Sequence, residues 1–262
     1  MKNLFLLALI ALLTGGCQIN VMQPDTDGDA VVPDANARLA RKLFVGGTDG
    51  RIVYGEEKYE YDGKGLLMKI SRLSRNAKGE MDLYSYDEYA YNEQQQAEKL
   101  SSYAFMQGRP FMTSLKKYDY PAANKIVEQT YAVNNKSEAT FISSRTETTM
   151  EQGLKARVIY YYVNNQTFVK GQETVYRYEA GRLTAQESLN PNGGLGTTFR
   201  YAYKGRTATV EEYMFNRPES ISSQSFQYDS RDRLTRSEVT KVNPLLCVAM
   251  VSGSATVYEY AD

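Results

Sequence analysis

The chain has 262 residues, with 31 basic and 31 acidic side chains and therefore a formal net charge of zero. It contains 22 tyrosines but no tryptophan and no histidine. The balanced charge provides no basic stripe, so nucleic-acid binding is not expected. Without histidine, a Ser-His-Asp or Cys-His catalytic arrangement is impossible, and so is a zinc site of the usual type. We therefore expect a protein that is not an enzyme.

The N-terminus has the pattern of an export signal. Lys2 supplies a small positive charge, and the apolar run from Leu4 to Leu13 is followed by Thr14-Gly15-Gly16-Cys17. The run is shorter than the roughly 20 apolar residues that a membrane-spanning helix needs. The pattern predicts a signal peptide over residues 1–16.

The residues at the end of this signal resemble the bacterial lipobox, in which the chain is cut before a cysteine that becomes lipidated. The resemblance implies a lipid anchor on Cys17, although Thr14 stands where the family prefers leucine. Gln18 follows the cysteine, which resembles the sorting signal of lipoproteins in the cell outer membrane. The domain would then face either the periplasm or the cell surface. The alternative is an ordinary secretory signal in which Cys17 has no role.

Residues 17–34 are predicted to be a lipid-anchored acidic linker, because they are rich in Asp and Pro and lack hydrophobic periodicity. Residues 24–34 resemble the acidic calcium loops of thrombospondin type 3 repeats. Alternate carboxylates suit a hard cation, so the resemblance implies a calcium site at Asp25, Asp27 and Asp29. The alternative is a solvated linker without metal. No other cofactor is expected.

A short N-terminal helix is predicted over residues 35–44. Asp34 would cap it, Leu39 and Leu43 lie four residues apart on one face, and Gly46-Gly47 would end it. We expect this helix to cover one end of a β-sheet.

From residue 58 onward the sequence repeats a short unit. The clearest copy is Tyr176-Arg177-Tyr178-Glu179-Ala180-Gly181-Arg182-Leu183-Thr184, and others begin at Tyr59 and Phe226. The step from Tyr176 to Tyr201 to Phe226 is 25 residues each time. Near its end the sequence contains Tyr258-Glu259-Tyr260, which matches the opening strand of one more copy and could close the edge of a sheet.

Each unit has the pattern of a β-hairpin. Tyrosines at positions i and i+2 lie on one face of a strand. A turn follows, then a second alternating strand such as Thr184 to Leu189, and then Asn190-Pro191-Asn192-Gly193-Gly194 as the next turn. One hairpin is not stable alone, so the hairpins must fold as a stack. The predicted fold is all-β: an extended or curled antiparallel sheet of repeated β-hairpins in one domain, residues 35–262.

These units resemble the YD repeats of the RHS family, in which each unit is a β-hairpin and successive hairpins form a long continuous sheet. The resemblance covers most of residues 58–262. Giant members of that family close into shells around toxins. This chain has too few repeats to enclose a protein cargo, so the shell function is not carried over.

Two runs are apolar on both faces, Val158 to Val163 and Leu245 to Val251. Both predict central strands that are buried on two sides. Cys247 lies in the second run and is expected to be a small buried apolar side chain. The adjacent acids Glu56-Glu57 and Glu211-Glu212 would point to opposite faces of their strands, so neither is a natural catalytic pair.

The function that fits these features is a non-enzymatic cell-envelope lipoprotein, which acts as a binding or structural scaffold through its tyrosine-rich sheet. Its expected partners are the membrane, through the anchor, and an envelope protein or glycan. The alternative is a carbohydrate-binding surface lipoprotein, since tyrosine rings stack on sugars and their hydroxyls form hydrogen bonds. A solvent-exposed cluster of three or more tyrosines in a groove would favour this alternative, whereas tyrosines buried against neighbouring hairpins would favour the scaffold or partner binding.

Overall fold

The computed structural model describes residues 38–46, 52–215, 217–241 and 254–261. Within these ranges the regular elements are 16 β-strands. No helix long and apolar enough to cross a membrane is found in this described part of the chain. The strands in chain order are β1 (Arg38–Gly46), β2 (Ile52–Tyr61), β3 (Leu67–Arg75), β4 (Met81–Tyr91), β5 (Ala97–Met106), β6 (Arg109–Ala122), β7 (Lys125–Val133), β8 (Ala139–Glu151), β9 (Leu154–Asn164), β10 (Thr167–Glu179), β11 (Arg182–Leu189), β12 (Leu195–Lys204), β13 (Thr207–Met214), β14 (Ser222–Tyr228), β15 (Leu234–Lys241) and β16 (Ala255–Ala261).

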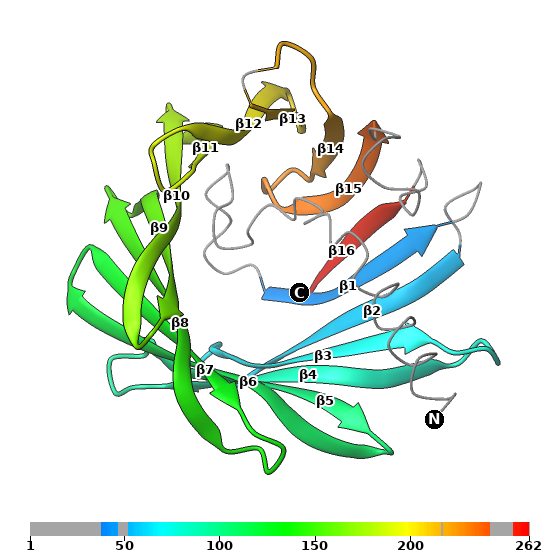
Figure 1. The fold of residues 1–262 in the computed structure, drawn as a ribbon. Coiled ribbons are helices and arrows are strands. Elements are labelled where there is room, and N and C mark those ends of the chain that lie inside the picture. Colours follow the sequence, from blue (N-terminus) through cyan, green and yellow to red (C-terminus); the bar gives the residue numbers. More distant parts are fainter. Residues whose placement is uncertain (1–37, 47–51, 216, 242–253, 262) are drawn as a thin grey trace, which may run out of the picture.

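Each strand pairs antiparallel with the next strand in the chain, and β1 pairs with β16 (Figure 1). The sheet is therefore a closed barrel of consecutive hairpins. The predicted all-β hairpin fold is confirmed, and closure goes beyond the open or curled sheet that the repeats indicated. The last strand contains Tyr258-Glu259-Tyr260, which completes the sheet as the extra half-copy predicted.

Four of the described hairpin turns share one hydrogen-bonding pattern, at Asp62, Asn76, Asn134 and Asp229. In the turn after β2, the side-chain oxygen of Asp62 accepts hydrogen bonds from the backbone N–H groups of Lys64 and Leu66, at 2.9 and 2.8 Å. Asp229 makes the equivalent contacts after β14. The third residue after the Asp has a positive φ, 86° at Gly65, which glycine adopts without strain. This side-chain bond explains why several copies of the repeat carry Asp or Asn directly after their tyrosines, as at Asp62 and Asp229.

The pairing register defines two faces of the sheet that run continuously around the barrel. We call the first the tyrosine face; it is defined by the first tyrosine of each repeat. These residues are Tyr59, Tyr89, Tyr118, Tyr176, Tyr201 and Tyr258. The second is the charged face, with Asp, Glu, Lys or Arg on every strand except β14. Examples are Arg41, Lys69, Glu88, Lys99, Glu147, Glu173, Arg200 and Glu238.

The second tyrosine of a repeat joins neighbouring strands through its hydroxyl. Tyr61, at the end of β2, donates a hydrogen bond to the backbone carbonyl of Leu39, at the start of β1. The same contact recurs at the ends of β4, β6, β12 and β16, with donor–acceptor distances of 2.8–3.0 Å. We call these five contacts the tyrosine latches. They close the outer end of a strand pair where the ladder of backbone hydrogen bonds stops.

The hydrophobic core lies on the tyrosine face where the sheet runs from β13 to β16. Its most deeply buried large side chains are Phe226 and Val210, which are 2% and 1% exposed. Leu234 and Tyr258 pack in the same cluster, and tyrosines of β12, β14 and β16 cover its edges. The repeated tyrosines thus supply core packing as well as latches.

Two sequence-based predictions about strands and helices are wrong. Residues 38–46 form β1, not a helix, because β2 and β16 each offer a free strand edge whose backbone groups pair with it. The two leucines do not share one face, as the helix prediction required. Leu39 pairs with Tyr260 on the tyrosine face, whereas Leu43 lies on the charged face after a bulge. Strand β9 is not buried on two sides, since Tyr160 and Tyr162 are each 42% exposed. The second run, Leu245 to Val251, lies outside the described residues.

Candidate functional site: an ionic network at the closing seam

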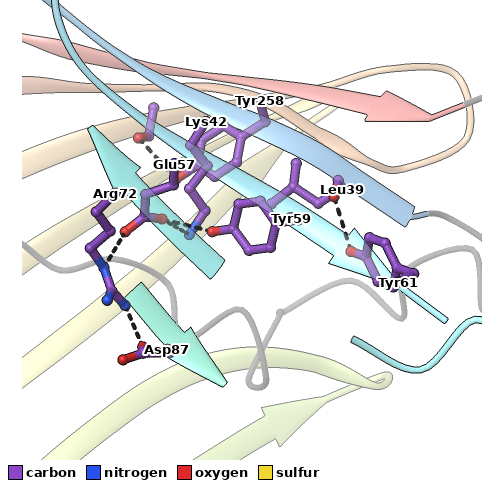
Figure 2. A network of polar contacts seen from close by, with 9 residues as sticks. Leu39, Lys42, Glu57, Tyr59, Tyr61, Arg72, Asp87 and Tyr258 are labelled. Carbon is purple, nitrogen blue, oxygen red and sulfur yellow. Dashed lines mark hydrogen bonds and ion pairs between the residues drawn. The ribbon is translucent and has the colours of Figure 1, made fainter. Parts of the chain in front are cut away.

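Four charged side chains of alternating sign lie side by side on the tyrosine face of β1 to β4 (Figure 2). Lys42 Nζ lies 3.7 Å from Glu57 Oε2, and Arg72 Nε lies 3.1 Å from Glu57 Oε1. Arg72 also donates from Nη2 to Asp87 Oδ2 at 2.7 Å. We call these four residues the seam network, because β1 is the strand at which the barrel closes.

Lys42 is the most deeply buried charge of the network, with a side chain that is 4% exposed. Its ammonium group lies 5.6 Å from the ring centres of both Tyr59 and Tyr258, within the range of cation–π contacts. Tyr258 belongs to β16 and Tyr59 to β2, so Lys42 joins the last strand of the barrel to the second. A long cation at this burial is stable only when it is paired.

The pKa shifts follow from burial and from these partners. Burial raises the pKa of the Tyr59 hydroxyl far above its usual value, and the nearby Glu57 carboxylate raises it further. This hydroxyl donates to Glu57 Oε2 at 2.7 Å and stays protonated. Burial lowers the pKa of Arg72, but its contacts with Asp87 and Glu57 outweigh that effect and raise it overall. The network therefore brings two basic and two acidic side chains together.

A second set of ion pairs lies at the same seam on the charged face. Arg41 Nε lies 2.5 Å from Glu259 Oε2 on β16, and its Nη1 lies 3.5 Å from Glu56 Oε1 on β2. Hydrogen bonding to Glu259 raises the pKa of Arg41. The two adjacent acids of β2 therefore point to opposite faces, as the strand pattern predicts. Each face ties β16 to β2 through a basic residue of β1.

The contacts of the seam network fit a role in stabilising the barrel and not in catalysis. Both of its carboxylates accept a hydrogen bond from a basic side chain or lie beside one, so neither is poised as a general base. Its charges cancel, so it does not concentrate charged ligands. The arrangement links the neighbouring strands β1 to β4, and the contact of Lys42 with Tyr258 extends it to β16, across the point where the barrel closes.

The predicted site residues lie outside the part of the chain that the structure describes. This applies to Cys17, to Asp25, Asp27 and Asp29, and to Cys247. Within the described ranges, no group of three or more Cys, Asp or Glu side chains is arranged to hold a metal ion. Lipidation and calcium binding therefore stay predictions.

The seam network itself was missed in the sequence, although a signal was present. Lys42, Glu57, Arg72 and Asp87 follow one another at a constant spacing of 15 residues. Lys42 pairs in register with Glu57, and Glu57 pairs with Arg72, whereas Asp87 lies two residues along β4 from Ser85, the register partner of Arg72. Charges of alternating sign at a constant spacing on successive strands therefore indicate ion pairs between directly opposite or diagonal neighbours.

Comparisons with known proteins give similarity of fold only. No family model and no curated protein matches the chain. A porin-like protein from Bacteroides vulgatus is 11% identical, with a TM-score of 0.34, over 86% of this chain and 99% of that one. A Bacteroides fragilis protein of unknown function is 14% identical, with a TM-score of 0.42, over 49% of this chain and 96% of that one. The TcdB2-TccC3-Cdc42 complex is 11% identical, with a TM-score of 0.23, over 76% of this chain and 13% of that one. All three TM-scores are below 0.5, so these likenesses carry no argument about the function of this chain.

Proposed function

We propose that this protein is a non-enzymatic lipoprotein of the cell envelope, anchored through Cys17, whose barrel is a rigid scaffold that contacts an envelope partner. The observation that carries this proposal is the use of the repeated polar groups. Tyrosine hydroxyls form the latches, and the buried charges of the seam network neutralise one another. These groups stabilise a closed ring instead of forming a reactive centre.

The distribution of charge supports a barrel that stays outside the lipid. A barrel inserted in a membrane needs an outward apolar band about 25 Å tall. Here the charged face has ionised residues on nearly every strand, such as Arg157 and Glu173, which form a contact of 2.5 Å. The tyrosine face carries Lys42 and Glu57 on β1 and β2, and Lys116 and Glu128 on β6 and β7. Within the described strands neither face offers such a band, which favours attachment by a lipid anchor.

The proposal is tested by labelling cells that express the full chain with a clickable fatty acid. We expect the label on the wild-type chain and its complete loss in Cys17→Ser. Cys247→Ser is the matched control, because it removes the other cysteine of the chain, and it should keep the label. A label that survives in Cys17→Ser, or that disappears in Cys247→Ser, would overturn the anchoring position.

A further inference from the structure

One part of the tyrosine face differs from the rest in carrying polar but uncharged groups. In the middle of strands β8 to β11, the residues that point to the tyrosine face follow from the pairing register. They are residues 144, 146 and 148 of β8, 158, 160 and 162 of β9, 172, 174 and 176 of β10, and 186 and 188 of β11. These positions hold Ser, Thr, Gln, Tyr and one Val, with no Asp, Glu, Lys or Arg. On the opposite face the same four strands carry ion pairs, so the absence of charge is specific to one side.

Two exposed aromatic rings stand at the centre of this surface. Tyr160 and Tyr162 are successive tyrosine-face residues of β9, and each is 42% exposed. Most tyrosines of this face are half-buried or buried, and five latch onto carbonyl groups. Within the described residues, neither Tyr160 nor Tyr162 has such a partner. Their hydroxyls are therefore available to a ligand.

The neighbouring strand leaves room for these rings. A Cβ atom at Gly171 of β10 would lie 3.1 Å from Tyr160 Cδ1 and 3.4 Å from Tyr162 Cδ1. Gly171 sits at a bulge between the pairs Lys170–Tyr161 and Gln172–Tyr160. The two rings thus lie against bare backbone, which gives a broad aromatic surface on the sheet.

Hydrogen-bonding side chains flank both rings in register. Thr146 pairs with Tyr160 from β8, Gln172 pairs with it from β10, and Ser144 pairs with Tyr162. The charges on the adjoining strands, Lys116 and Glu128, lie 3.0 Å apart and neutralise each other. The surface therefore offers ring faces for stacking, hydroxyl and amide groups for directional hydrogen bonds, and no net charge.

We propose that Tyr160 and Tyr162, with Thr146 and Gln172, form a binding surface for a neutral saccharide. Sugar rings present apolar C–H faces that stack on aromatic rings, while their hydroxyls exchange hydrogen bonds with side chains of this kind. A neutral sugar matches the missing charge, whereas an acidic glycan would find no basic partner. This inference rests on the proposed scaffold function, because it names the ligand class of the same tyrosine face.

The test is binding of the full chain, purified in a detergent without a sugar headgroup, to immobilised neutral and acidic oligosaccharides. The probes are oligosaccharides of glucose, mannose, galactose and xylose, with oligogalacturonate as the acidic comparison. We expect binding to at least one neutral probe and none to oligogalacturonate. Affinity should fall at least about tenfold in Tyr160→Ala/Tyr162→Ala and severalfold in Gln172→Leu, with unchanged far-UV circular dichroism.

Tyr84→Ala is the matched control, because Tyr84 is 49% exposed on β4, away from this surface. It should leave the affinity unchanged. Failure of every neutral probe, preference for oligogalacturonate, or undiminished binding by the folded double variant would each overturn the saccharide site. The fatty-acid label on Cys17 does not depend on saccharide binding. Failure of the saccharide site can therefore be distinguished from failure of the proposed lipid-anchored scaffold.

Discussion

Removal of the shared carboxylate from the seam network is expected to destabilise the barrel more than removal of an exposed carboxylate. Glu57 lies beside Lys42 Nζ and accepts hydrogen bonds from Arg72 Nε and the Tyr59 hydroxyl. Breaking a buried pair by deleting one partner costs about 3–5 kcal/mol, because an uncompensated charge stays buried. Here the buried remainder is Lys42, with a side chain only 4% exposed.

The expected magnitude lies at the lower end of that range. Arg72 is 28% exposed and keeps its 2.7 Å contact with Asp87, so it loses only part of its pairing. Lys42 keeps its contacts with two tyrosine rings. We therefore expect Glu57→Ala to cost about 3 kcal/mol. Glu57→Gln keeps an acceptor for Tyr59 and should cost about 1–2 kcal/mol.

The assay is urea and thermal unfolding followed by far-UV circular dichroism, since the chain has no tryptophan. For a domain of this size, about 3 kcal/mol corresponds to a fall in Tm of roughly 6–12 °C. Glu187→Ala is the control, because its partner Arg177 is exposed and such surface pairs contribute little. Lys42→Met/Glu57→Met removes both charges and should be less destabilised than Glu57→Ala. Equal losses for Glu57→Ala and Glu187→Ala would refute the reasoning.

Three further predictions follow from other parts of the molecule. Tyr260→Phe removes the latch to Leu234 and should lower the free energy of unfolding by about 1 kcal/mol, measured by urea unfolding; an unchanged midpoint would show that the latch is dispensable. Hydrogen bonds from Arg157 and Lys170 lower the pKa of Glu173 from 4.5 to about 2, so its stabilising effect is fully present above about pH 4.5 and is lost as the pH falls toward 2. Thermal melts between these pH values should therefore converge for wild type and Glu173→Gln at the acid end, and a constant difference would contradict the shift. If Asp25, Asp27 and Asp29 bind calcium, calorimetry of the full chain should detect a calcium-dependent heat that Asp25→Asn/Asp27→Asn/Asp29→Asn abolishes, and no heat in the wild type would remove the site.

The sequence predicted the hairpins well because their signals are local. Tyrosines at alternate positions and an Asp or Asn at the turn depend only on neighbours in the chain, as at Tyr59, Tyr61 and Asp62. The final half-copy at Tyr258 also indicated that a strand was left to pair. Its partner was not identified, because residues 38–46 have a helical spacing of leucines and the repeat begins only after them.

What escaped prediction depends on contacts between distant strands. The strand state of β1 is decided by β2 and β16, and β16 follows more than 200 residues later. The seam network likewise depends on register across four strands. The exposure of Tyr160 and Tyr162 was missed because an apolar run in the sequence does not say whether a neighbouring strand supplies a covering side chain or, as at Gly171, none.

The most direct test of the account is fractionation of cells that express Cys17→Ser, with Cys247→Ser beside it. If the barrel is held by the lipid anchor alone, the Cys17→Ser protein should leave the membrane fraction as a folded β-rich protein. The Cys247→Ser protein should stay with the membrane. A Cys17→Ser barrel that remains folded in the membrane and resists extraction at high pH would contradict the account, because the strands themselves would then hold it in the lipid.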